Sequence, residues 1–177
     1  KYNLPIKKDY IINPVIGEYD DPYHQSQGIV TLPISKNGNT IVYGISGSGK
    51  TTFLTTLLYS IISQYSSDEI NLYIMDFASE TLKAYQEAPQ IGDVVLSYEE
   101  EKIKNLFKLL IDELKTRKKL FSNFGGDIIN YNINSITKSH SIVTIIHNYT
   151  AFSEIYDELE DEIAYLTREG SKYGLYF

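Results

Sequence analysis

The amino-acid sequence predicts an α/β fold in which a mostly parallel sheet is covered by helices on both faces. Two observations support this prediction. Short apolar runs, with the length of buried strands, alternate along the chain with longer segments of helical apolar spacing. In addition, the glycine-rich stretch "GISGSGKTT" (44–52) lies between the first such strand and the first such helix, the strand–turn–helix context of a phosphate-binding loop.

The predicted elements follow one another with short connections. Residues 1–37 read as an extended N-terminal segment that packs on the core, because prolines interrupt its short apolar runs. Residues 38–177 read as the main domain, incomplete at its C-terminus, since the final run "GLYF" opens a strand just where the chain stops. Strands are expected at 40–44, 70–77, 91–96, 141–148 and from 174 onward, and helices at 52–65, 97–124 and 154–174.

Composition narrows the range of functions. The 177 residues suffice for one domain with an α/β core. The sequence has no cysteine, which excludes disulfides and thiolate metal sites, and its three histidines are scattered. No apolar run approaches the roughly 20 residues that a membrane-spanning helix needs.

The stretch "GISGSGKTT" has the residues that bind nucleotide phosphates. Its glycines allow the backbone to curl so that N–H groups point at an anion, and the following helix adds the positive end of its dipole. Lys50 is expected to reach the β- and γ-phosphates, and the Thr51 hydroxyl to coordinate Mg²⁺. The predicted nucleotide-binding residues are Gly44, Ile45, Ser46, Gly47, Ser48, Gly49, Lys50, Thr51 and Thr52.

The charge of the chain disfavours DNA as a partner. The formal net charge is −7, and sequence-independent nucleic-acid binding requires a clear basic surface. Basic residues concentrate in one predicted helix, but acidic residues interrupt them, so a solvated helix face is favoured over a DNA track. These residues are Lys108, Lys115, Arg117, Lys118 and Lys119.

Several stretches together resemble the FtsK/SpoIIIE class of P-loop ATPases. They are "NTIVYGISGSGKTTFLTTLLYSI", "INLYIMDF", "LLIDELKTRKKLFSNFGGDIINYN" and the terminal strand–helix–"GLYF" unit. Within that class, "VIGEYDDPYHQSQGIVTLPI" looks like the entry to the C-terminal ATPase modules, in particular the third, of the EssC family of type VII secretion coupling proteins. The resemblance implies a RecA/FtsK-like fold that binds ATP and Mg²⁺.

The resemblance also implies where the second nucleotide motif lies. In the family, the strand directly after the P-loop helix lies further out in the sheet, and a later strand ends in the Asp-Glu pair that supports Mg²⁺ and polarises water. Here that strand is "SIVTIIHN", so the pair is replaced by His147 and Asn148. An amide cannot take a proton from water, so weak or absent hydrolysis is expected. Asp76, at the end of "LYIMD", remains open as a substitute carboxylate.

A trans-acting arginine is a further family feature, expected shortly before the last strand. The register places Ser171 at that position, and the nearest cations are Arg168 and Lys172. Arg168 reads better as a residue at a helix end, where a cation meets the C-terminal carbonyl groups.

The resemblance implies partners and a location, and it leaves a second function open. The expected partners are secreted helical proteins or neighbouring ATPase modules of the same polypeptide, in a ring oligomer on the cytoplasmic side of the cell membrane. Membrane contact would come only through the rest of the polypeptide. The aromatic residues Tyr149, Phe152 and Tyr156 are candidates for a docking surface or for a sheet-edge cover. The alternative function is an active DNA-translocase motor; a small-molecule kinase or GTPase is disfavoured because the matching motifs are missing.

Overall fold

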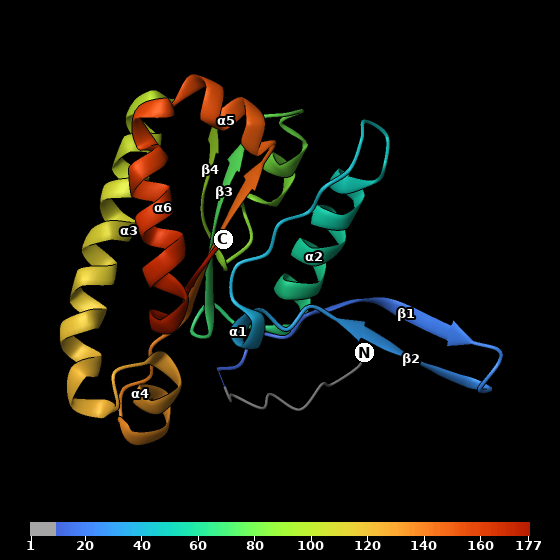
Figure 1. Ribbon diagram of the computed structural model, residues 1–177, viewed down its shortest axis with the longest axis horizontal. Helices are drawn as coiled ribbons and strands as arrows, with labels where there is room; N and C mark the ends of the chain where they lie inside the picture. The colour runs from blue at the N-terminus through green and yellow to red at the C-terminus, as the bar shows by residue number, and fades with distance from the viewer. Residues whose placement is uncertain (1–9) are drawn as a thin grey trace.

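A four-stranded parallel sheet forms the centre of the computed structural model, which describes residues 10–177 (Figure 1). Its strands are β3 (Ile70–Asp76), β4 (Ile91–Leu96), β5 (Ser141–His147) and β6 (Leu175–Tyr176), in the spatial order β4-β3-β5-β6. Each neighbouring pair is parallel. The predicted α/β class is therefore confirmed; β3 and β5 are both inner strands of this sheet.

Helices cover both faces of the sheet, as the alternating pattern predicts. The helix α2 (Lys50–Gln64) lies on one face, and α3 (Glu100–Phe121) and α6 (Glu160–Gly170) lie together on the other (Figure 1). Parallel strands need such crossover connections, because a tight turn cannot bring the chain back to the same end. Over residues 10–177, none of the helices is both long enough and apolar enough to cross a membrane.

The sheet separates two apolar cores, and strand periodicity decides which side chain joins which core. Successive side chains of a strand point to opposite faces. Leu72 and Ile74 of β3 therefore pack in the core beneath α2, whereas Met75 packs in the core beneath α3 and α6. In β5, Val143 and Ile145 follow the same alternation toward α2.

Shorter elements fill the connections, and some of them depart from the prediction. The expected helix at 154–174 is divided, because Tyr156 leaves the helical conformation (φ −126°, ψ 50°) and its ring is buried against the sheet. A helix after the "GG" pair was not predicted. The short elements are η1 (Thr81–Tyr85), η2 (Ser122–Phe124), α4 (Ile128–Asn134), α5 (Tyr149–Ile155), η3 (Asp157–Leu159) and η4 (Ser171–Tyr173).

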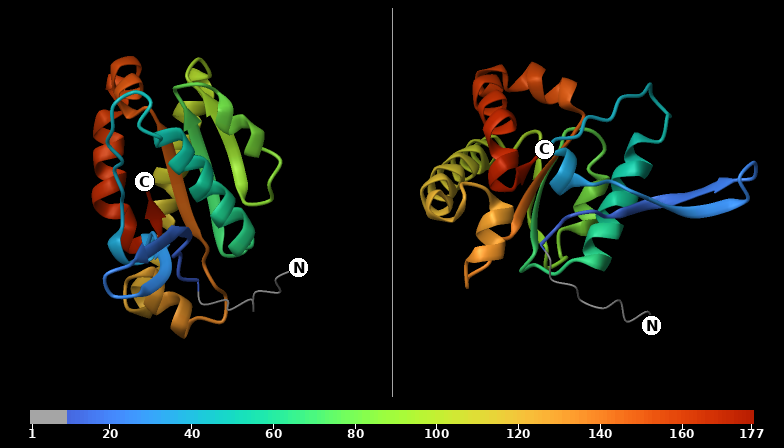
Figure 2. Two further views of the ribbon diagram at one scale, coloured as in Figure 1. Left: turned by 90° about the vertical axis from the view of Figure 1, so that its right-hand side faces the viewer. Right: turned by 60° about the horizontal axis from the view of Figure 1, so that its bottom comes forward.

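The N-terminal region contains regular structure that the proline pattern concealed. Strands β1 (Val15–Asp21) and β2 (Ser26–Thr31) form an antiparallel hairpin that extends away from the sheet and α2 (Figure 2). The short helix α1 (Ile34–Asn37) follows it. Buried Ile12 and Ile34 join the core beneath α2 on either side of this hairpin. Residues 1–9 of the predicted N-terminal segment lie outside the described residues.

The strand predicted at 40–44 is wrong. Thr40 N donates to Phe177 O at 2.8 Å, so this segment begins to run beside the end of the sheet. Beyond that bond, the described part of the chain offers residues 41–44 no neighbouring strand, and the Ile41 side chain is 74% exposed. Apolar patterning identifies a segment suited to a strand, but a strand forms only where a neighbour accepts its hydrogen bonds.

The prediction that the basic residues of α3 lie on a solvated face is wrong for Arg117. Arg117 is 1% exposed; its Nε donates to Glu113 Oε1 at 2.7 Å and its Nη1 to the carbonyl oxygen of Tyr173 at 2.9 Å. Burial lowers the pKa of Arg117 from its ordinary value, and the hydrogen bond with Glu113 opposes that change. The guanidinium therefore ties α3 to the turn before β6.

Glu113→Ala should lower the free energy of unfolding by about 3 kcal/mol, because it leaves a buried guanidinium without its counter-ion. The matched control is Asp112→Ala, which removes the partner of Lys115 on the exposed side of the same helix turn. That change should cost less than about 1 kcal/mol. Urea denaturation of both variants measures the difference, and equal losses would contradict the structural role of Arg117.

Candidate functional site

The glycine-rich loop has a backbone that requires its glycines. Gly47 and Gly49 adopt positive φ angles of 77° and 89°, a region that is costly for residues with a Cβ atom. Gly49 is the residue before α2, so this conformation turns the chain directly into the helix at Lys50. A Cβ atom at Gly44 would collide with the Ser48 hydroxyl group. The spacing of these glycines thus matches the curvature of the loop.

Lys50 contacts the backbone at the beginning of this loop. Its Nζ donates to the carbonyl oxygens of Gly44, at 2.6 Å, and Ile45, at 2.8 Å. An ammonium group has three protons, so it can retain part of this contact while it also binds an anion. A hydrogen bond from a cation to an anionic oxygen is stronger than one to a carbonyl.

The first turn of α2 adds a second source of attraction for anions. The first backbone N–H groups of a helix have no partner within the helix, and they form the positive end of its dipole. The first turn of α2 contains no acidic side chain that would compete for them. Loop, lysine and helix end therefore define an anion-binding position of the kind that phosphates occupy.

Two polar residues lie beside this position because of strand register. Asp76 ends β3 and His147 ends β5, and these two residues are paired in register. Each lies two residues beyond a side chain that packs toward α2, so both side chains face α2 and the loop. They are 1% and 6% exposed, respectively.

These two side chains and Thr51 form a continuous chain of hydrogen bonds. The Thr51 Oγ1 atom lies 3.1 Å from His147 Nε2, and His147 Nδ1 lies 3.0 Å from Asp76 Oδ1. Asp76 also accepts backbone N–H bonds from Ala78, at 3.1 Å, and Leu82, at 3.2 Å. The imidazole thus separates the Asp76 carboxylate from Thr51. The sequence offered Asp76 as a substitute carboxylate for position 147, but their contact with each other and with Thr51 was not predicted; the alternation of side chains along the two strands was the signal that could have shown it.

Asn148 has partners of its own. It adopts a positive φ of 72°, which asparagine tolerates better than most residues, and it caps α5. Its Oδ1 accepts from Ala151 N at 3.4 Å, and its Nδ2 donates to Phe77 O at 3.3 Å. The amide is therefore occupied by local structure.

The residues at this position fit a divalent cation that arrives with a phosphate ligand. Within residues 10–177, no three His, Cys, Asp or Glu side chains group closely enough to hold a metal ion. Mg²⁺ is usually held by few protein ligands together with substrate phosphates and water. Thr51 supplies one oxygen of the required kind, whereas the neighbouring imidazole nitrogen suits harder cations poorly.

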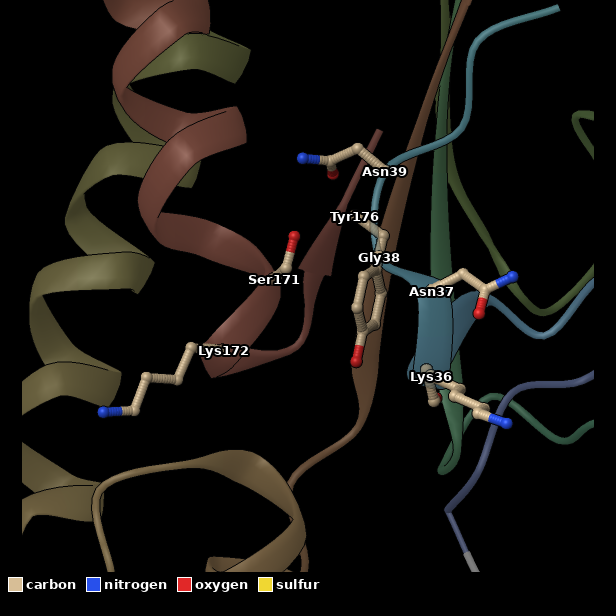
Figure 3. Close-up of a pocket in the computed structure, with 8 residues that line it drawn as sticks. Lys36, Asn37, Gly38, Asn39, Ser171, Lys172 and Tyr176 are labelled. Carbon is tan, nitrogen blue, oxygen red and sulfur yellow. The ribbon is translucent and has the colours of Figure 1, made fainter.

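Apart from the glycine-rich loop, a second hollow lies between α1 and η4, and Tyr176 of β6 is part of its lining (Figure 3). Ser171 and Lys172 line it together with Lys36, but the two lysine side chains point away from each other. Asn39, on its rim, donates to Thr167 O at 2.6 Å and accepts from Phe177 N at 2.9 Å. These bonds explain its polar lining as local structure.

The remaining predicted residues lie apart from the loop. Arg168 pairs with Glu169 at 3.3 Å near the end of α6, in an exposed position. Phe152 and Tyr156 are 0% and 4% exposed, so the expected docking surface is wrong for both. Phe152 stacks on Phe107 of α3 at a centroid distance of 5.8 Å, and both rings belong to the core beneath α3 and α6. Only Tyr149 of that group is exposed, at 45%.

A parallel sheet whose carboxyl ends meet a glycine-rich loop at the start of a helix defines the class of P-loop nucleotide-binding domains. The FtsK/SpoIIIE family model matches residues 17–160, and the chain belongs to this family.

Similar proteins come from type VII (ESX) secretion systems. The ESX secretion system protein YukB of Bacillus subtilis is 31% identical over 159 residues, which cover 89% of this chain and 11% of YukB. The solved structure of EssC (ATPases 2 and 3) from Geobacillus thermodenitrificans matches with a TM-score of 0.85 and 28% identity, over 93% of this chain and 32% of that one. The chain therefore spans only about a tenth of the length of YukB.

A second solved structure has the same fold. It is Thermomonospora curvata EccC (ATPases 2 and 3) in complex with a signal sequence peptide, with a TM-score of 0.85 and 23% identity. The match covers 99% of this chain and 33% of that one. At this identity the likeness concerns the fold alone.

Proposed function

We propose that the chain is an ATP-binding module of a type VII secretion coupling protein, with weak or absent hydrolysis. The observation that supports this most directly is the contact between Thr51 and His147. It brings β5 beside the loop and leaves an imidazole and an amide where the family has its Asp-Glu pair. General-base assistance contributes about a hundredfold to ten-thousandfold to typical rates, so its loss suppresses turnover.

The nucleotide site comprises residues 44–52, with Lys50 on the phosphates and Thr51 on Mg²⁺. The anion-binding geometry of the loop and the family membership support this assignment. In this proposal residues 38–177 form the nucleotide-binding domain, and the described part of the preceding segment packs on it through Ile12 and Ile34.

The partners in this proposal are proteins. Neighbouring ATPase modules of the same polypeptide are supported by the similar structure that contains ATPases 2 and 3, and secreted helical substrates by the similarity to proteins of ESX secretion systems. The module acts on the cytoplasmic side of the membrane, within a larger membrane-anchored protein that can form a ring. A further similar structure, that of the cytoplasmic domain of EssC, supports this location.

A DNA-translocase motor is the less supported function. The chain carries a net charge of −7, and several basic residues of α3 have acidic partners. Lys104 pairs with Glu100, Lys115 with Asp112 and Lys118 with Glu169. Such pairs leave little of the unbalanced positive charge that phosphate backbones attract.

Lys50→Ala should abolish most of the thermal stabilisation that Mg-ATP gives the domain. A ligand that binds only the native state stabilises it by about 2.7 kcal/mol at a hundredfold excess over its dissociation constant. Differential scanning fluorimetry with and without Mg-ATP measures the shift. Lys36→Ala, at the second hollow, is the control and should keep it. A full shift in the Lys50 variant would place the nucleotide elsewhere.

Restoring the acidic pair should raise ATP turnover. Because His147 touches buried Asp76, an aspartate at position 147 would face another carboxylate, so the test combines Asp76→Asn, His147→Asp and Asn148→Glu. Turnover should rise at least about tenfold over the wild-type chain, which is part of the hundredfold or more that a well-placed general base supplies.

The matched control for this experiment is the same variant without Asn148→Glu, which should stay at background. The Asn148→Glu change also removes a helix cap, so some loss of stability, about 1 kcal/mol, is expected. Robust hydrolysis by the wild-type chain would contradict the proposal.

A further inference from the structure

We propose that Asp76 is a positioning residue that fixes the tautomer of His147, so that the imidazole accepts the Thr51 proton and the Thr51 oxygen stays open to a nucleotide-bound cation. This inference rests on the proposed nucleotide-binding function. It assigns Asp76 a role through the imidazole ring, in place of direct contact with the cation.

The environment of Asp76 determines which ring nitrogen of His147 carries hydrogen. The Asp76 carboxylate receives two backbone N–H bonds, from Ala78 to Oδ1 and from Leu82 to Oδ2. A carboxylate held by donors acts as an acceptor, so the imidazole nitrogen that faces Oδ1 must present a hydrogen. The strand register keeps His147 Nδ1 at 3.0 Å from that oxygen. The neutral ring that satisfies this contact carries its hydrogen on Nδ1.

The other side of the ring faces Thr51. With hydrogen on Nδ1, Nε2 has a free lone pair and accepts the hydroxyl proton of Thr51 across 3.1 Å. The oxygen lone pairs of Thr51 then remain available. In the opposite tautomer, Nε2–H would donate to Thr51 and occupy a lone pair that a cation needs.

The contacts of His147 with Asp76 and Thr51 explain how a histidine is accommodated at the end of β5. In the related arrangement of metal-binding histidines, a carboxylate fixes the ring from behind, and loss of that carboxylate typically costs about 10-fold to 100-fold in metal affinity. Here the ring orients a hydroxyl group, and both ring and carboxylate are almost wholly buried. Rotation of either side chain would leave buried polar atoms unpaired, which favours one arrangement.

The direct test is the tautomer of His147 in the wild-type chain, measured by long-range ¹H–¹⁵N NMR. The chain has three histidines, so spectra of His24→Gln and His140→Gln variants assign the remaining signals to His147. We expect a neutral ring with hydrogen on Nδ1, both without nucleotide and with Mg-ATPγS. A ring with hydrogen on Nε2, or on both nitrogens, would overturn the inference. This test leaves both Asp76 and His147 unchanged.

The second test compares ATPγS affinity with Mg²⁺ and with EDTA in the Asp76→Asn variant. An amide can donate to Nδ1 and so favour the wrong tautomer, as it does in serine-protease triads. The gain in affinity that Mg²⁺ provides should fall about tenfold, whereas affinity in EDTA should stay within about twofold of the wild-type value. An unchanged Mg²⁺ gain in the folded variant would overturn the inference.

A matched control lies at the opposite end of the same two strands. Asn71 of β3 has its Nδ2 atom 3.0 Å from Nε2 of His140, the residue before β5, so Asn71→Asp alters the partner of a histidine without touching the loop. In this variant, the gain in ATPγS affinity that Mg²⁺ provides should equal the gain in the wild-type chain. Failure of wild-type ATPγS binding in any condition would instead refute the nucleotide-binding function, so the two failures are distinguishable.

Discussion

In-register pairing of β3 with β5 is the constraint that organises both the core and the site. It pairs residue with residue along the whole of both strands, from Ile70 with Ser141 to Asp76 with His147. Because side chains alternate across a sheet, this register sends aliphatic residues into the two cores and two polar residues to the end that faces the loop. A slip of one residue would exchange these faces, so core packing also fixes the geometry beside Thr51.

The pairing of β3 with β5 places a buried polar contact directly behind an exposed loop. The Asp76–His147 contact lies at the edge of the core beneath α2, where low exposure strengthens hydrogen bonds and penalises unpaired groups. The loop itself is exposed, and its lysine is bonded to backbone carbonyl oxygens that a phosphate can replace. A rigid support behind an open anion-binding loop suits a module that binds nucleotide and holds it.

Local pattern predicted the fold class, the parallel sheet and the long helix that ends before Gly125. Contacts between distant residues could not be predicted in the same way. The segment at 40–44 has strand-like residues but lacks a neighbour in the described chain. In the sequence Arg117 resembles the lysines around it, but in the structure it is buried and bonded to the turn before β6. Asn148 caps α5, and the helix predicted from the sequence began only at residue 154, after most of α5.

The chemical state of the bound nucleotide tests binding without turnover most directly. The domain would be incubated with Mg²⁺ and radiolabelled ATP for an hour, separated from free nucleotide by rapid gel filtration and then denatured. Chromatography of the released nucleotide should show about one intact ATP per domain. Recovery of mainly ADP would contradict the account.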